Sequence, residues 1–338
     1  LRAGFARVVL EGYRGGCRVP EEHLVEARDA FAAEGIEALG GLAPVCGEGA
    51  GKAGEGAESR NPFYCLSDPE TRQLLEREVR KLARVFSQVV VGDGFLTTCR
   101  CATCDAQRGH HDWGAFRRSL LTRTAEDWAS AARAERADVR MIVKTPQSHD
   151  RCCLYGYDAE GFPRAFHAVW AGTETRNPET FDFGYVQPYE GYFNALWTRH
   201  CAGTKLEAGC FDYLDCDDQL FYEQAMTTAL GGLRDIVVFP YDRAVFAGSK
   251  LLRLREAAPM MEEFAAIATD PIGVHTIKPL HADPGRDHYV FDYLGMMGVP
   301  CIPARQIQPA MRSVFVSAHG AADPGVREAI TRAILSGR

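Results

Sequence analysis

The chain has 338 residues, of which 46% are hydrophobic and 25% are charged, and this is the composition of a soluble globular protein with a sizeable core. One large domain or two would account for that length. The net charge of −7 comes without a basic stripe of interleaved aromatics, which argues against nucleic acid as a partner. No apolar run approaches the length of a membrane span, so we expect no membrane partner either.

The chain has 12 cysteines, and whether they form disulfides depends on the redox state of the cellular compartment. Three of them are crowded as C-x-C-x-x-C at residues 99–104, where they cannot easily pair with one another. This spacing favours a reducing, cytoplasmic location over a disulfide framework. The first residue is Leu1 and not Met, so a secretory leader could precede it, and secretion is the alternative.

Short apolar runs alternate with amphipathic helical patterns along the chain, which is typical of parallel βα units. A helical face of Leu24, Ala27 and Phe31 ends at Gly35, and Pro69 opens a second helix. Polar and aromatic residues gather where strands give way to loops, which favours a (β/α)8 barrel over an open sheet. The runs that predict strands cover residues 6–13, 36–45, 88–93, 139–144, 165–170, 205–211 and 235–239.

Further apolar runs follow at residues 273–278, 299–302 and 314–317. The first of them either closes the barrel or starts a second α/β domain, and we favour the second alternative. We therefore predict the α/β class, with a TIM-type barrel over residues 1–270 and an incomplete, flavodoxin-like α/β segment over residues 271–338.

A constellation of four cysteines is the strongest site signal in the sequence. Three thiols follow the strand predicted at residues 88–93, and a fourth lies upstream at the mouth of another loop. Four thiolates from two loops complete a tetrahedral zinc shell with no open position, so the predicted zinc is structural. The predicted ligands are Cys65, Cys99, Cys101 and Cys104.

Several alternatives compete with this zinc site. The thiols could be unrelated core cysteines, and His110 or His111 could supply the fourth ligand in place of Cys65. A cysteine-ligated iron–sulfur enzyme would have a wider first spacing and an open iron, so Cys65 near the cluster would count against it. A metal-dependent barrel hydrolase needs H-x-H at a strand end, and the sequence contains no such motif.

Three segments together resemble glycoside hydrolase family 42, the β-galactosidase-type enzymes. They are Tyr-Cys-Leu-Ser-Asp-Pro at residues 64–69, Cys-Arg-Cys-Ala-Thr-Cys at 99–104 and Ala-Phe-Arg-Arg-Ser-Leu at 115–120. The resemblance implies a four-cysteine zinc site beside a catalytic barrel. It also implies that an amidotransferase-like trimerisation domain follows the barrel, and residues 287–337 resemble the beginning of that domain. It aligns the first strand here with the second strand of the family, so the opening strand would be absent. It also implies a homo-oligomer, a trimer.

The resemblance also places the catalytic acids. The family carries one glutamate after its fourth strand and another after its seventh, and these positions hold Asp93 and Asp212 here, as in a divergent relative. A retaining glycosidase needs two carboxylates about 5 to 5.5 Å apart, and an inverting one needs a wider gap. Aspartate is shorter than glutamate by about 1.5 Å, so two aspartates would leave a wider gap between the carboxylates, and inversion is therefore an alternative. Glu174, at a third strand end, could replace either aspartate, pair with Arg176 or bind a sugar hydroxyl.

Aromatic and basic residues at the predicted strand ends favour a carbohydrate substrate, because rings stack on sugar faces. Arg14 and Lys144 could bind an acidic sugar or simply neutralise the carboxylates, and Arg176 is a further substrate-binding candidate. Each ring alone could simply be packing. The aromatic candidates are Tyr13, Trp113, Trp170, Phe211, Tyr213 and Tyr241. The sequence therefore predicts a glycoside hydrolase, and the alternative is a non-catalytic carbohydrate-binding or assembly protein on the same barrel.

Overall fold

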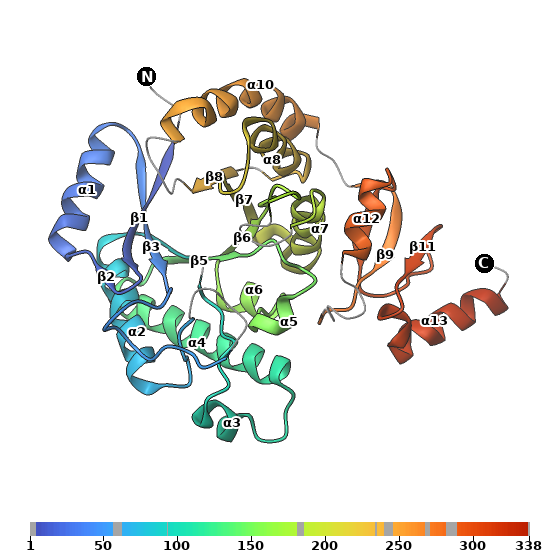
Figure 1. Cartoon of the computed structure of the whole chain (residues 1–338), viewed down its shortest axis with the longest axis horizontal. Coiled ribbons are helices and arrows are strands. Elements are labelled where there is room, and N and C mark those ends of the chain that lie inside the picture. Colours follow the sequence, from blue (N-terminus) through green and yellow to red (C-terminus); the bar gives the residue numbers. More distant parts are fainter. Residues whose placement is uncertain are drawn as a thin grey trace. The chain divides into compact units, whose positions relative to one another are not determined.

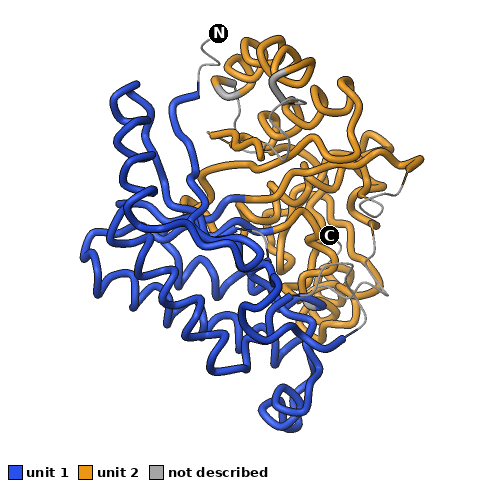
Figure 2. Tube along the Cα trace, turned by 60° about the vertical axis from the view of Figure 1, so that its left-hand side comes forward, with its two compact units in different colours: residues 1–145, 153–170 blue, residues 146–152, 171–338 orange. Residues whose placement is uncertain are grey.

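The computed structural model of the chain alternates helices with parallel strands (Figure 1). It describes residues 5–56, 63–92, 94–180, 186–233, 235–239, 246–267, 271–281 and 289–336. The chain forms two compact units, the first of residues 1–145 and 153–170 and the second of residues 146–152 and 171–338 (Figure 2).

The elements as far as the sixth strand are β1 (Arg7–Arg14), β2 (Cys17–Arg18), α1 (Glu21–Ala33), β3 (Glu37–Ala43), α2 (Pro69–Val85), β4 (Gln88–Val91), α3 (Ala102–Arg108), α4 (Trp113–Glu135), β5 (Arg140–Thr145), α5 (Cys152–Tyr155), α6 (Gly161–Ala165) and β6 (Ala168–Gly172). β1, β3, β4 and β5 pair in parallel in that order. β2 pairs antiparallel with the end of β1.

Local sequence explains where α2 begins and how closely it packs. The Asp68 carboxylate accepts a hydrogen bond from the Thr71 N–H at 2.8 Å, and Pro69 takes the first helical position. The helix end lies so close to β3 that a Cβ at Gly40 would stand 2.6 Å from the Phe86 ring. This approach requires a residue without a side chain in the strand.

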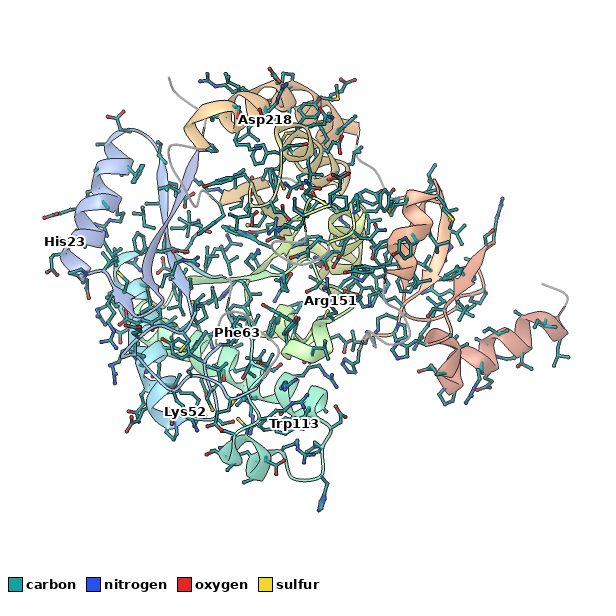
Figure 3. All side chains as sticks on the ribbon, viewed as in Figure 1. His23, Lys52, Phe63, Trp113, Arg151 and Asp218 are labelled. Carbon is teal, nitrogen blue, oxygen red and sulfur yellow. The ribbon has the colours of Figure 1, made fainter. Side chains whose placement is uncertain are left out.

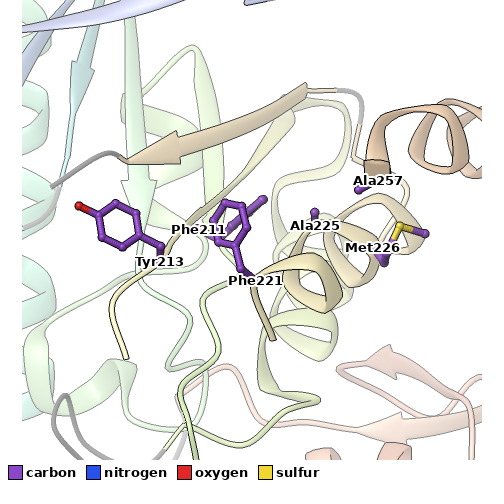
Figure 4. Packing of buried hydrophobic residues seen from close by; sticks show 6 residues of the cluster. All are labelled: Phe211, Tyr213, Phe221, Ala225, Met226 and Ala257. Carbon is purple, nitrogen blue, oxygen red and sulfur yellow. The ribbon is translucent and has the colours of Figure 1, made fainter. Parts of the chain in front are cut away.

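The second unit continues with α7 (Glu190–Ala202), η1 (Gly203–Lys205), β7 (Leu206–Asp212), α8 (Asp218–Leu230), β8 (Asp235–Phe239), η2 (Phe246–Lys250) and α10 (Leu251–Ile267). β7 and β8 pair in parallel. A buried apolar cluster joins β7 to α8 and α10 (Figure 4). Its members are Phe211, Tyr213, Phe221, Ala225, Met226 and Ala257.

Strands that follow one another in the chain are neighbours in the main sheet, whose order is β2-β1-β3-β4-β5-β6-β7-β8. Sequential parallel strands joined by helices are the arrangement of a (β/α)8 barrel. The seven predicted runs correspond to β1 and to β3 through β8, so the predicted barrel class is confirmed.

The last segment has its own three-stranded sheet. Its elements are β9 (Val274–Ile277), α12 (Val290–Met296), β10 (Cys301–Ala304), β11 (Val314–Val316), η3 (Gly320–Ala322) and α13 (Pro324–Leu335). The strand order is β10-β9-β11, and both pairings are parallel. The run at 273–278 therefore pairs with the two later runs and not with the main sheet, while a domain boundary at residue 270 stays a prediction.

Among the residues that the structure describes, no helix has both the length and the apolar character needed to cross a membrane.

Candidate active site and metal centre

Four buried sulfurs converge in the first unit. Cys65 lies before α2, Cys99 and Cys101 follow β4, and Cys104 lies on α3. Their Sγ atoms all lie within 4.8 Å of one another. Cys65 Sγ lies 3.8 Å from Cys101 Sγ and 3.6 Å from Cys104 Sγ, too far for a disulfide bond. Such a cluster could hold a metal ion.

Groups around the cluster favour negative charge on Cys99 and Cys101, which have lowered pKa values, whereas the hydrogen bond with Cys104 is the largest of the effects that raise the pKa of Cys65. The Glu55 N–H donates a hydrogen bond to Cys99 Sγ at 3.3 Å, and the Lys52 ammonium (Figure 3) bonds with Cys101. A hydrogen bond from the Cys104 thiol is the largest of the effects that hold the pKa of Cys99 well below its ordinary value. Thiolates are the form in which cysteine binds metals.

Cys65 is the fourth member of the cluster, as the sequence predicts. The alternative ligands, His110 and His111, are both exposed and do not belong to the cluster. The sulfurs thus come from two separate places in the chain, residue 65 and residues 99–104.

The carboxylate of Asp212, at the end of β7, is held by a guanidinium. Arg176 Nη1 lies 2.8 Å from Asp212 Oδ1, and Arg176 Nη2 lies 3.0 Å from Asp212 Oδ2. The Leu214 N–H also donates to Oδ1, at 2.9 Å. Both carboxylate oxygens therefore accept hydrogen bonds from a charged donor, the geometry of an ionised carboxylate and not of a proton donor.

Glu174 lies near the same guanidinium, two residues after the end of β6, and is buried. Burial lowers the pKa of Arg176, but the charges of Asp212 and Glu174 outweigh burial and place that pKa above its ordinary value. A Cβ at Gly172 would stand 2.6 Å from Glu174 Oε2, so this glycine leaves room for the carboxylate. The structure thus brings Glu174, Arg176 and Asp212 together.

Gln224 on α8 ties these two strand ends to each other. Its Oε1 accepts a hydrogen bond from the Thr175 N–H at 2.9 Å, and its Nε2 donates to the Asp212 carbonyl at 3.0 Å. The side chain is fully buried. The backbone around both acids is therefore fixed from the helix side.

A family model described as "Probable glycosyl hydrolase, catalytic domain" matches residues 2–260. The chain belongs to this glycosyl hydrolase family. Uncharacterized protein SSO3021 of Saccharolobus solfataricus is 22% identical over 353 residues, an alignment that covers 91% of this chain and 56% of that protein. The chain thus spans little more than half the length of that relative.

Solved structures of glycosidases share the fold of this glycosyl hydrolase domain. The β-galactosidase of Marinomonas ef1 aligns with a TM-score of 0.67 and 11% identity, over 98% of this chain and 70% of that one. A catalytic mutant of a GH42 β-galactosidase of G. stearothermophilus aligns with a TM-score of 0.57 and 11% identity, over 82% and 55%. The PgaB glycoside hydrolase domain of Bordetella bronchiseptica aligns with a TM-score of 0.56 and 10% identity, over 73% and 88%. The predicted resemblance is confirmed in that the chain is a divergent glycosyl hydrolase domain that shares its fold with family 42 enzymes.

Two predicted sugar-binding residues lie at the end of β1 in the first unit. Tyr13 is fully buried, and its hydroxyl bonds with that of Tyr64. Arg14 forms two hydrogen bonds of 2.6 Å with Glu11. Their contact with a sugar stays a prediction, and in this structure each side chain already has a protein partner.

The remaining candidates differ in their surroundings. Lys144 and Trp170 are buried in the first unit, and Tyr213 is buried against α8 in the second. Trp113 has the guanidinium carbons of three arginines within 5.7 Å of its ring, which is packing of a kind that leaves little ring face for a ligand. Asp93 and Tyr241 lie outside the described residues.

Sequence reasoning missed a group of buried charged residues in the second unit. Its buried members are His149, Asp150, Glu190 and Asp292, and the partly exposed Arg151 joins them. The signal is present in part, because the polar run Ser-His-Asp-Arg at residues 148–151 begins three residues after the end of β5. Nothing local indicated its partners, because His149 and Asp292 lie 143 positions apart.

Proposed function

We propose that this protein is a glycosidase that cleaves a glycosidic bond between carboxylates at the ends of its strands. The observation that carries the proposal is the meeting of Glu174 and Asp212 at the Arg176 guanidinium, in a domain of a glycosyl hydrolase family. Glycosidases need one carboxylic acid that protonates the leaving oxygen and one carboxylate that attacks the sugar or activates water.

The hydrogen bonds suggest how the roles divide. Both Asp212 oxygens accept from Arg176, so Asp212 fits the carboxylate role. The proton donor is then Glu174 or Asp93. When a sugar binds, Arg176 would give up its two hydrogen bonds to Asp212. Arg176 or Tyr213 would then contact the sugar ring. Tyr13, Arg14, Lys144 and Trp170 complete the proposed sugar-binding set.

The four-cysteine cluster fits zinc. Sulfurs about 2.3 Å from one tetrahedral zinc ion lie about 3.8 Å from each other. Cys65 Sγ lies 3.6 Å from Cys104 Sγ and 3.8 Å from Cys101 Sγ, close to that spacing, and all four sulfurs lie within 4.8 Å of one another. With four protein ligands the zinc would have no open position, so its contribution is to fix the loops before α2 and after β4.

A panel of chromogenic glycosides tests the enzyme proposal, with the full chain and three variants. Glu174→Gln and Asp212→Asn should each lower kcat by about 10²- to 10⁴-fold, the usual effect of losing an acid or base. Glu223→Gln is the matched control, because Glu223 is exposed and its carboxylate accepts a hydrogen bond from Gln219 on the same helix. The anomer formed first, read by NMR, separates retention from inversion.

Unchanged turnover in both carboxylate variants would remove Glu174 and Asp212 from the mechanism. Binding of glycans without turnover, on every glycoside of the panel, would favour the alternative of a carbohydrate-binding or assembly protein on the same barrel. A trimer, which the family resemblance implies, would appear in analytical ultracentrifugation at three times the 37.2 kDa mass of this chain.

A further inference from the structure

The second unit contains a buried charged network that the proposed chemistry does not use. Its first part is a pair in which His149 Nε2 lies 3.1 Å from Asp292 Oδ1. Its second part is Arg151 (Figure 3), whose Nε lies 3.1 Å from Asp150 Oδ1 and whose Nη2 lies 2.9 Å from Glu190 Oε1. The network joins the loop of residues 146–152 to the start of α7 and to α12.

Burial makes this network costly unless its geometry is kept. The side chains of His149, Asp150, Glu190 and Asp292 have no exposed surface. Taking an ionised group out of water costs several kcal/mol, and the attraction of a partner repays that only in a good arrangement. A network of this kind fixes the relative positions of the segments that supply it.

Aromatic packing supports the same three segments. The His149 ring lies 4.8 Å from that of Phe193 on α7, and Phe193 stacks on Phe291 of α12 at 5.0 Å with 4° between the planes. The Arg151 guanidinium carbon lies 5.6 Å from the ring centre of Tyr289, which precedes α12. α12 therefore meets the 146–152 loop through both charge and stacking.

Helix α7 carries this constraint to the candidate active site. Asn194 Nδ2 donates to the Pro146 carbonyl at 3.1 Å and to the Gly172 carbonyl at 2.8 Å. A Cβ at Gly191 would stand 2.6 Å from the Thr173 carbonyl oxygen, so the helix backbone lies directly against the end of β6. Glu174 is one residue further along.

We propose that α12 is a positioning element for Glu174, acting through Asp292 and His149 on the 146–152 loop and through Asn194 on the end of β6. The inference rests on the proposed function in that Glu174 is taken as a catalytic acid. In this view the segment after the barrel contributes no group to the chemistry. Instead, this segment determines the position of the Glu174 carboxylate.

Hydrogen exchange of the full chain, followed by mass spectrometry, tests the positioning without any substrate. In Asp292→Asn, exchange in residues 172–176 should rise by about tenfold or more, because the variant weakens the hydrogen bond through which α12 holds the 146–152 loop. Peptides of α2 and β4 in the first unit should keep their rates. Tyr293→Ala is the control, because Tyr293 lies on the same helix and is 47% exposed.

Two replacements of His149 separate a positioning role of its hydrogen bond to Asp292 from a role in packing alone. His149→Gln keeps a donor for Asp292 and should exchange nearly as wild type, whereas His149→Leu should match Asp292→Asn. On a glycoside that the protein hydrolyses, Asp292→Asn should lower kcat by about tenfold with KM changed by less than about twofold.

Increased exchange confined to α12 and the 146–152 loop, with residues 172–176 unchanged, would overturn the inference and leave the glycosidase proposal standing. Conversely, increased exchange at 172–176 in a protein that hydrolyses no glycoside would support the positioning and count against the enzyme. If Asp292→Asn does not fold, His149→Gln against His149→Leu gives the same comparison, and equal exchange at 172–176 in both would overturn it.

Discussion

Removing the guanidinium of Arg176 tests how firmly the structure holds Asp212. Two hydrogen bonds of 2.8 and 3.0 Å join the pair, and the side chains are only 8% and 6% exposed. Loss of one partner leaves an uncompensated buried charge, which costs about 3 to 5 kcal/mol. About 1 kcal/mol shifts the melting temperature of a 150 to 250-residue domain by about 2 to 4 °C, so Arg176→Met should lower that of the second unit by about 6 to 20 °C.

Differential scanning calorimetry of the full chain gives the readout. The double variant Arg176→Met/Asp212→Leu removes both charges of the pair and should recover part of the lost melting temperature, because Glu174 is then the one carboxylate of the group left without the guanidinium. Arg253→Met is the control, since its pair with Glu256 is 44% and 57% exposed and such pairs contribute about 0 to 1 kcal/mol. An Arg176→Met protein that melts within about 2 °C of wild type, or a double variant as unstable as the single one, would refute the reasoning.

Three further predictions concern the metal, the pH and a helix cap. Zinc loading should raise the melting temperature of the first unit in wild type and in Cys17→Ala, whose thiol is exposed, but not in Cys65→Ala; calorimetry with metal analysis checks this. Burial and the nearby carboxylates raise the pKa of Glu190 well above 4.5, although the charge of Arg151 opposes this shift. The protonated Glu190 therefore stabilises the fold fully below about pH 4.5. This stabilisation is lost as the pH rises through the raised pKa, and the free energy of unfolding then falls by up to about 1.4 kcal/mol per pH unit. Glu190→Gln should therefore flatten the fall in melting temperature between pH 5 and 8, and a wild-type-minus-variant difference that is independent of pH would contradict this. Asp68→Ala should cost about 1 kcal/mol through loss of the α2 cap, seen as a lower midpoint in urea, and an unchanged midpoint would contradict it.

The strands and the cysteine cluster could be predicted because their signals are local. Apolar runs of strand length, with turn residues between them, locate β1 and β3 through β8 without knowledge of any partner. The C-x-C-x-x-C spacing alone brings three sulfurs near one point, and Cys65 lies just before the cap of a helix whose start was also legible.

The direction of individual side chains was harder to predict. The pairing of β1 with β3 changes register between Glu11 and Tyr13, which is a bulge. One extra residue reverses the side of the sheet to which later side chains point, so alternation along the strand does not tell which way Tyr13 faces. The hydroxyl of Tyr13 bonds with that of Tyr64, and no sequence pattern around either residue predicts this partner.

The buried charged network could not be predicted from the sequence for a related reason. His149 needs Asp292, and Arg151 needs Glu190, and the two members of each pair lie far apart in the chain. A charged residue in a loop reads as solvated unless its partner is known, because buried charges are rare. Only the folded chain shows that these side chains are paired and covered.

The contact between His149 and Asp292 limits how the chain can be divided for study. A fragment that ends at residue 270, where the barrel was predicted to stop, would lack Asp292 and the Phe291 ring that stacks on Phe193. Its truncated surface would present an imidazole and an aromatic face to water, a combination that invites aggregation during expression. Shorter versions of this protein for crystallisation or enzymology should therefore retain the chain at least through α12.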